Sequence, residues 1–106
     1  MDKRQTLKQD EAIEIVRRYK HEITSFFGGR IKVYMFGSYS KGNANSDSDI
    51  DVAVVVPKID KDKWLEWSKT LWHYVDGVSM LIEPVLMEQD EQSPLYRDVM
   101  RTGIAV

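Results

Sequence analysis

The stretch from Val33 to Val56, V-Y-M-F-G-S-Y-S-K-G-N-A-N-S-D-S-D-I-D-V-A-V-V-V, limits the folds open to this chain more than any other part of the sequence. Alternating side chains over residues 30–36 predict a strand that breaks at Gly37, and residues 49–56 predict a second strand that a proline ends. The second run is apolar on both faces after Asp51, which is typical of a central strand. We therefore predict two neighbouring strands joined by a polar loop, with acidic residues where the second strand begins.

The rest of the sequence supplies helices and further strands. Apolar residues at helical spacing predict amphipathic helices over residues 6–27 and 60–76, and a proline opens a short helix over residues 94–103. Residues 78–87 predict a third strand, and residues 104–106 predict a final edge strand. This order predicts a small α/β fold, with helices packed on a mixed sheet.

The predicted helix over residues 60–76 carries all three tryptophans of the chain. Trp64 and Trp67 share a helical face with the apolar residues that follow, and Trp72 extends this face. We predict that these three side chains pack in the core, with a contribution to a protein interface as the alternative.

Length and composition exclude several classes of protein. A chain of 106 residues is expected to form a single domain over residues 1–106, and a net charge of -2 gives no reason to expect duplex nucleic acid as a partner. The sequence has no Cys, which excludes disulfides, thiolate zinc sites and Cys nucleophiles. The charged N-terminus does not resemble a secretory signal, and no apolar run reaches the roughly 20 residues of a membrane span. We therefore expect a cytoplasmic protein with no membrane contact.

Asp49 and Asp51 are the first candidates for a chemical role. Strand alternation puts their side chains on the same face and Ile50 on the other, so the two carboxylates converge on one small volume. Without a cation they repel each other, and one pKa rises. Because Mg²⁺ binds carboxylate oxygens together with phosphate oxygens and water, a pair of Mg²⁺ ions would relieve this repulsion. The pattern favours a magnesium site, with a solvated acidic loop as the alternative.

Asp47 precedes this pair and has a different interpretation. Flanked by two serines, it fits a turn-capping aspartate better than a metal ligand. The spacing of Asp47, Asp49 and Asp51 also matches the opening of an EF-hand calcium loop. Because Val52 stands where that loop requires Gly, and a strand follows in place of a loop ending in Glu, we reject the EF-hand.

Gly37 and Ser38 directly follow the first predicted strand. Glycine allows a close approach of the backbone, successive amides in such a turn bind phosphate oxygens, and the serine hydroxyl is a further donor. A plain turn is the alternative, and the residues from Ser38 to Gly42 could form a short helix. Lys41 is a candidate contact for a triphosphate, with a solvent-exposed lysine as the alternative.

Glu83 is the third acidic residue of interest, because it lies within the otherwise apolar run V-S-M-L-I-E-P-V-L-M. A carboxylate in such surroundings needs a partner. If the third strand lies beside the second, Glu83 completes a triad with Asp49 and Asp51. The alternative is a glutamate on an edge strand that points to water, next to an edge-compatible Pro84.

The spacing of these residues resembles a known signature. Residues 37–51 read G-S-Y-S-K-G-N-A-N-S-D-S-D-I-D, which resembles the G-S-x-x-x-G…S-D-x-D pattern of the DNA polymerase beta-like nucleotidyltransferase superfamily. The size and layout are most similar to the minimal nucleotidyltransferases (MNT), and residues 82–85 and 93–106 resemble this family's third strand and final helix. The resemblance covers nearly the whole chain and implies the small polymerase beta-like fold.

The resemblance also implies a reaction: two Mg²⁺ ions assist the transfer of a nucleoside monophosphate, AMP from ATP, to an acceptor hydroxyl with release of pyrophosphate. The implied catalytic residues are also the implied metal ligands: Asp49, Asp51 and Glu83. Glu83 would ligate the metal that activates the acceptor hydroxyl. The implied nucleotide contacts lie in the loop between the strands: Gly37, Ser38, Lys41 and Ser48.

The resemblance implies a partner as well. Minimal nucleotidyltransferases often act with a HEPN-type helical protein, in toxin–antitoxin pairs in which the MNT component is the antitoxin, and the resemblance implies transfer of AMP to the toxin. We expect an acceptor of this kind, in a homo- or hetero-oligomer, because 106 residues leave no room for an acceptor-binding domain. The alternative is an antitoxin without catalysis, which neutralises a HEPN partner by direct contact.

Overall fold

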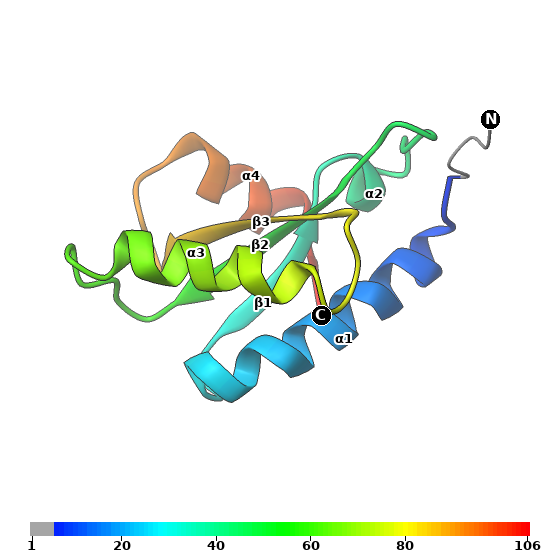
Figure 1. The fold of residues 1–106 in the computed structure, drawn as a ribbon. Coiled ribbons are helices and arrows are strands. Elements are labelled where there is room, and N and C mark those ends of the chain that lie inside the picture. Colours follow the sequence, from blue (N-terminus) through cyan, green and yellow to red (C-terminus); the bar gives the residue numbers. More distant parts are fainter. Residues whose placement is uncertain (1–5) are drawn as a thin grey trace.

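The computed structural model describes residues 6–106, in which helices and strands alternate along the chain (Figure 1). The elements are α1 (Gln9–Phe27), β1 (Lys32–Phe36), α2 (Ser38–Lys41), β2 (Ile50–Val56), α3 (Trp64–Val75), β3 (Ile82–Glu88), α4 (Pro94–Thr102) and β4 (Ile104–Ala105). None of the helices in residues 6–106 is both long enough and apolar enough to cross a membrane.

The strands form one mixed sheet in the order β3-β2-β1-β4. β1 pairs antiparallel with both β2 and β4, whereas β2 pairs parallel with β3. The prediction of a central second strand is therefore confirmed, and the third strand lies beside it, which the sequence left open. Pro84 lies in the edge strand β3, where its missing N–H group can face away from the sheet.

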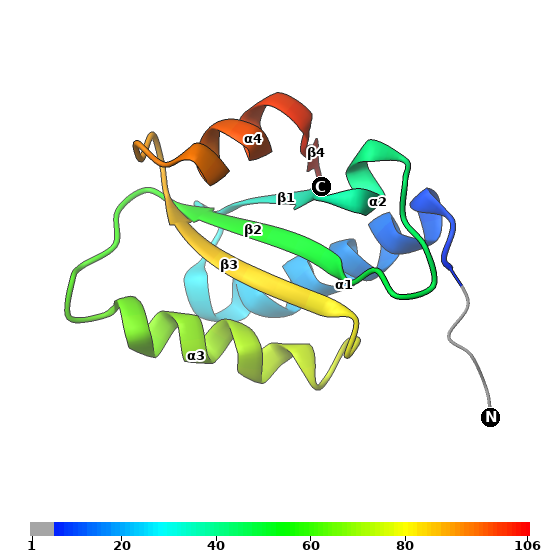
Figure 2. The same cartoon turned by 90° about the horizontal axis from the view of Figure 1, so that it is seen from above.

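Helices cover both faces of this sheet, as Figures 1 and 2 show, with α1 and α3 on one side and α4 on the other. Strand alternation produces this division. Val52 and Val54 of β2 pack with buried residues of α1 and α3, whereas Ala53 and Val55 pack in a second cluster that includes Tyr96 of α4. Within residues 6–106, α4 is the helix that packs on this second face.

Three elements begin three or four residues later than the sequence predicts, and the first two strands begin one or two residues later. The first helix begins at Gln9, where the Lys8 N–H group donates to Glu11 Oε1 at 2.8 Å and fixes the start. The third helix begins at Trp64, after a turn over residues 61–63. The third strand begins at Ile82, because the residues after α3 continue as turns before the chain reaches the sheet. The predicted short helix after Gly37 is confirmed as α2.

The prediction that all three tryptophans pack in the core is wrong for two of them. Trp67 packs against the core and makes an edge-to-face contact with Phe27, with ring centroids 5.9 Å apart. Trp64 and Trp72 are 51% and 49% exposed. The face of α3 that is buried against α1 and β3 is narrower than the run of apolar residues along the helix, so the outer tryptophans lie at its margin.

Candidate active site

The sheet brings two of the predicted acidic ligands together. In the parallel pairing of β2 with β3, Asp51 and Glu83 are direct register partners. Asp51 and Ala53 are two residues apart in β2, so their side chains lie on the same face of the sheet. This is the face that α4 covers. Asp51 is half-buried, while Glu83 and Asp49, which directly precedes β2, are exposed. Glu83 is thus an exposed residue of an edge strand, as the alternative interpretation required, and it also lies beside Asp51.

The three carboxylates are close enough to influence one another electrostatically. Burial raises the pKa of Asp51 to about 6, and the negative charges of Glu83 and Asp49 contribute to the rise. The Lys41 ammonium opposes it. A carboxylate whose ionised form is disfavoured by its surroundings in this way is typical of a functional site.

Gly37 lies against the Asp51 carboxylate. Phe36 and Asp51 are register partners in the β1–β2 pair, so the chain leaves β1 at the point where Asp51 stands. A Cβ atom at Gly37 would overlap Asp51 Oδ2, and the backbone angles of Gly37, φ 75° and ψ -149°, are those that glycine adopts and other residues avoid. Only glycine therefore lets the backbone turn and the acid approach each other this closely.

The turn after Gly37 is held in place by α1. Tyr39 is buried, and its hydroxyl accepts a hydrogen bond from the Leu7 N–H group at 3.2 Å. The Gln9 side-chain amide donates to the Tyr39 carbonyl at 2.9 Å, and Ser40 Oγ donates back to the Gly37 carbonyl at 2.9 Å. These contacts fix the orientation of α2, which carries the predicted phosphate contact Ser38 at its first position.

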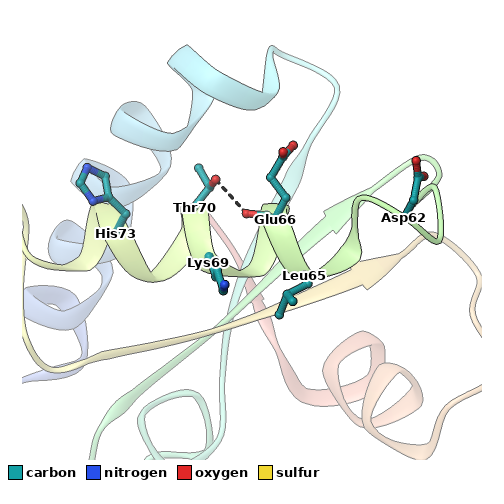
Figure 3. Close-up of a pocket in the computed structure, with 6 residues that line it drawn as sticks. All are labelled: Asp62, Leu65, Glu66, Lys69, Thr70 and His73. Carbon is teal, nitrogen blue, oxygen red and sulfur yellow. Dashed lines mark hydrogen bonds between the residues drawn. The ribbon is translucent and has the colours of Figure 1, made fainter.

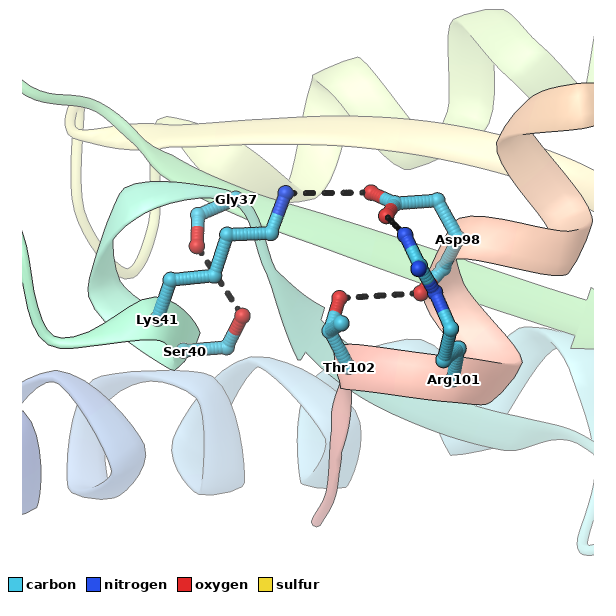
Figure 4. A network of polar contacts seen from close by, with 6 residues as sticks. All are labelled: Gly37, Ser40, Lys41, Asp98, Arg101 and Thr102. Atoms are coloured by element: carbon cyan, nitrogen blue, oxygen red, sulfur yellow. Dashed lines mark hydrogen bonds and ion pairs between the residues drawn. The ribbon is translucent and has the colours of Figure 1, made fainter.

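Lys41, a predicted nucleotide contact, reaches across to α4 (Figure 4). Its ammonium Nζ lies 3.3 Å from Asp98 Oδ2. The other oxygen of Asp98, Oδ1, accepts from Arg101 at 3.2 Å, and the Asp98 carbonyl accepts from the Thr102 hydroxyl at 2.9 Å. α2 and α4 are therefore joined by a charged bridge next to the acidic residues.

Ser48 and Asp47 lie in the loop between α2 and β2. The Ser48 hydroxyl accepts from the Asn45 N–H group at 2.9 Å, and the Ser48 N–H group donates to the Asn45 carbonyl at 3.0 Å. The Asp47 N–H group donates to Asn45 Oδ1 at 2.8 Å. The loop thus folds on itself around Asn45, and Ser48 shapes the segment that delivers Asp49.

The donor atoms near Asp51 suit a magnesium ion, because all are carboxylate oxygens. No group of three or more His, Cys, Asp or Glu side chains within residues 6–106 is drawn together into a complete metal site. Mg²⁺ usually takes one or two carboxylates and completes its shell with water and substrate phosphates, so it does not need such a group. A cation would also relieve the charge repulsion at Asp51.

A hollow of about 640 Å³ lies elsewhere, over the outer surface of α3 (Figure 3). Its lining residues come from α3 and the turn before it: Asp62, Leu65, Glu66, Lys69, Thr70 and His73. None of the predicted metal or nucleotide contacts belongs to this hollow, which lies over the helix that covers the opposite face of the sheet. The acidic residues therefore remain the better candidate for the site of chemistry.

Comparisons with known proteins identify the family of this chain. A family model described as the nucleotidyltransferase domain matches residues 16–100, so this chain belongs to the nucleotidyltransferase domain family. No curated protein matched the sequence.

Solved structures confirm the predicted fold class. A candidate nucleotidyltransferase from Sulfolobus solfataricus superposes with a TM-score of 0.70 at 19% identity, over 92% of this chain and 81% of that chain. A toxin–antitoxin structure with AMP-PNP gives a TM-score of 0.50 at 24% identity, over 93% and 72% of the two chains. A third structure, the tri-AMPylated HEPN toxin of Shewanella oneidensis in complex with MNT antitoxin, gives a TM-score of 0.45 at 21% identity, over 92% and 67% of the two chains.

Sequence reasoning missed the residues that reach the loop from outside it. Asp98 and Arg101 stand three residues apart on a helix, a spacing that predicts a local ion pair but does not reveal that Lys41 joins it. Gln9 gave no signal either, because a glutamine at the start of a helix has many uses. These residues are separated from the loop by about 30 to 57 positions, and only the tertiary fold brings them there.

Replacing Gly37 by Ala tests the close approach to Asp51. We expect Gly37→Ala to lower the free energy of unfolding by about 2–4 kcal/mol, because the backbone strain is joined by a clash with the carboxylate. Gly42→Ala is the matched control, since Gly42 also has a positive φ of 77° but has open space around it, and about 1–2 kcal/mol is expected. Urea denaturation of both variants checks this, and equal losses would contradict the proposed clash.

Replacing Asp51 by Asn tests how much the ionised carboxylate destabilises the folded protein. The folded-state pKa of about 6 lies above the ordinary 3.8, so the stability linked to this group is present below the lower value and is lost as pH rises through about 6. Without divalent metal, Asp51→Asn should therefore be more stable than wild type at pH 8, by about 1 kcal/mol because solvent screens a half-buried group. The difference should disappear near pH 3.5.

Urea denaturation at the two pH values measures this, with Asp47→Asn as a control in the exposed loop that precedes β2. If Asp51→Asn and wild type differ by the same amount at pH 8 and pH 3.5, the electrostatic cost assigned to Asp51 is wrong.

Proposed function

We propose that this chain is a Mg²⁺-dependent nucleotidyltransferase that transfers AMP from ATP to a hydroxyl group of a HEPN-type partner protein, as the antitoxin of a toxin–antitoxin pair. Membership of the nucleotidyltransferase domain family supports the class of reaction. The observation that carries the proposal is the direct register of Asp51 with Glu83, with Asp49 two residues earlier and Gly37 against the carboxylate.

In this proposal the acidic residues hold the metals. Asp49 directly precedes β2 and Asp51 is the second residue of this strand, while Glu83 is the register partner of Asp51 in β3. Mg²⁺ bound there would neutralise the charge that develops on the attacking and leaving oxygens. The resemblance to minimal nucleotidyltransferases assigns to Glu83, on the edge strand β3, the metal that activates the acceptor hydroxyl.

The turn after β1 holds the triphosphate in this proposal. Gly37 and Ser38 stand beside Asp51, so the backbone of this turn would bind the β- and γ-phosphates while the α-phosphate faces the acidic residues. Lys41 supplies a positive charge from the same turn, and Ser48 supports the loop that returns to Asp49. The acceptor hydroxyl then loses its proton to water, its oxygen bonds to the α-phosphorus, and the bond between the α-phosphorus and the bridging oxygen breaks, so that pyrophosphate leaves with the electron pair.

The partner and the nucleotide are proposed on two grounds. A toxin–antitoxin structure with AMP-PNP, an analogue of ATP, shares this fold at a TM-score of 0.50. The sequence signature resembles minimal nucleotidyltransferases, which often act with HEPN-type proteins. Both fit the place of Glu83, which is exposed on the edge strand β3 where an acceptor could approach.

The test is transfer of label from α-labelled ATP. The chain is incubated with Mg²⁺ and a HEPN-type protein encoded beside it, and the labelled partner is followed by gel electrophoresis and mass spectrometry. We expect labelling by wild type and a loss of at least about 100-fold with Asp49→Asn/Asp51→Asn, because both metal-binding carboxylates are then absent. Asp47→Asn is the matched control, since this exposed residue lies in the same loop and should leave labelling intact.

Neutralisation of the partner is measured in parallel. If wild type labels nothing, and the double variant still neutralises the partner, the chain acts by contact alone and the enzymatic proposal is wrong. If labelling persists in the double variant, the metal assignment is wrong although the activity stands.

A further inference from the structure

Lys41 stands between two acidic groups. Its ammonium pairs with Asp98 at 3.3 Å, and its charge also opposes the rise in the pKa of Asp51. The first contact holds the side chain toward α4, and the second shows that the ammonium lies within electrostatic range of the proposed metal site. The charge of Lys41 is therefore shared between its ion pair with Asp98 and the acids of the proposed site.

Asp98 has a second cation of its own. Arg101, one helical turn further along α4, donates to the carboxylate oxygen that Lys41 does not use (Figure 4). Hydrogen bonds from Lys41 and Arg101 together lower the pKa of Asp98, so the group stays ionised. If Lys41 leaves, Arg101 still neutralises the carboxylate.

The bridge is built from exposed side chains. The relative exposures are 41% for Lys41, 27% for Asp98 and 78% for Arg101. Exposed ion pairs are weak, because water screens the charges and the side chains lose freedom. A triphosphate carries several negative charges and would compete with a single carboxylate for Lys41, so the pair can be broken at small cost.

We propose that Asp98 is a positioning residue that holds the Lys41 side chain against α4 in the absence of nucleotide and releases it to the triphosphate when nucleotide binds. Arg101 then neutralises the Asp98 carboxylate alone. This proposal rests on the proposed function, in which Lys41 contacts the triphosphate. It adds that nucleotide binding competes with the contact between α2 and α4. Asp98 therefore limits the affinity for nucleotide.

The experiment measures the dissociation constant of Mg²⁺–AMP-PNP by titration calorimetry at one ionic strength. Asp98→Asn removes the competing charge, and we expect it to bind the nucleotide about two- to five-fold more tightly than wild type. Lys41→Met should bind more weakly, and Lys41→Met/Asp98→Asn should match Lys41→Met, because Asp98 acts through Lys41. Asp62→Asn is the charge-matched control outside the α2–α4 bridge, with no change expected.

Arg101→Met provides an independent arm. Without the guanidinium, Asp98 depends on Lys41 alone, so the nucleotide should bind about two- to five-fold more weakly than to wild type. In the Asp98→Asn background the same change should have no effect. A merely structural role of Arg101 would instead weaken binding in both backgrounds.

The outcomes separate this proposal from the function on which it rests. If Lys41→Met weakens binding but Asp98→Asn leaves it unchanged or weakens it, the release of Lys41 is wrong and the proposed function stands. Tighter binding by Asp98→Asn that persists without Lys41 would mean that Asp98 acts as a distant charge, which also overturns the proposal. If wild type binds no nucleotide, or Lys41→Met binds it as well as wild type, Lys41 does not contact the nucleotide. The proposed release of Lys41 from Asp98 is then wrong as well.

Discussion

The contact between Gly37 and the Asp51 carboxylate is the constraint on which the arrangement of the site depends. The antiparallel pairing of β1 with β2 sets Phe36 opposite Asp51, so the chain must leave β1 at the position of the acid. A side chain at Gly37 would occupy the space of the carboxylate, and its backbone conformation is one that glycine alone tolerates well. The backbone amides of the following turn and the acidic group are thus held side by side, a juxtaposition that a nucleotide with its metal can use.

The sheet separates stability from chemistry by its two faces. Alternation along β2 sends Val52 and Val54 into the large core beneath α1 and α3, and sends Asp51 to the face that α4 covers. The larger cluster of buried residues lies between the sheet and the helices α1 and α3, and it supplies most of the apolar burial that stabilises the fold. The face that α4 covers can therefore carry charged side chains. Placing an ionised carboxylate on this face is unfavourable. The raised pKa of Asp51 shows this, because burial and two neighbouring carboxylates disfavour its charged form.

Sequence patterns could predict the helices, the strands, a mixed sheet and the acidic residues where the second strand begins. Strand alternation and helical spacing depend only on a few neighbouring residues. They singled out Glu83 but left its place open, because the order of the strands in the sheet is not visible in the sequence, and only the parallel pairing of β2 with β3 sets it beside Asp51. They could not predict that Trp72 lies at the margin of the core, because the width of the buried face depends on the crossing of α3 over the sheet. The ion pair of Asp98 with Lys41 could not be predicted either, because it joins two helices that only the complete fold brings together.

The central claim is that the carboxylates of Asp49, Asp51 and Glu83 hold divalent metal beside a bound triphosphate. Anomalous diffraction from crystals grown with Mn²⁺ and AMP-PNP tests it most directly, because manganese replaces magnesium at oxygen sites and is located by its own signal. The expected result is an anomalous peak in contact with the Asp49 and Asp51 carboxylates and the nucleotide phosphates, with Glu83 reaching the metal on the acceptor side. A bound nucleotide whose manganese contacts none of these three residues, or lies elsewhere on the protein, would contradict the claim.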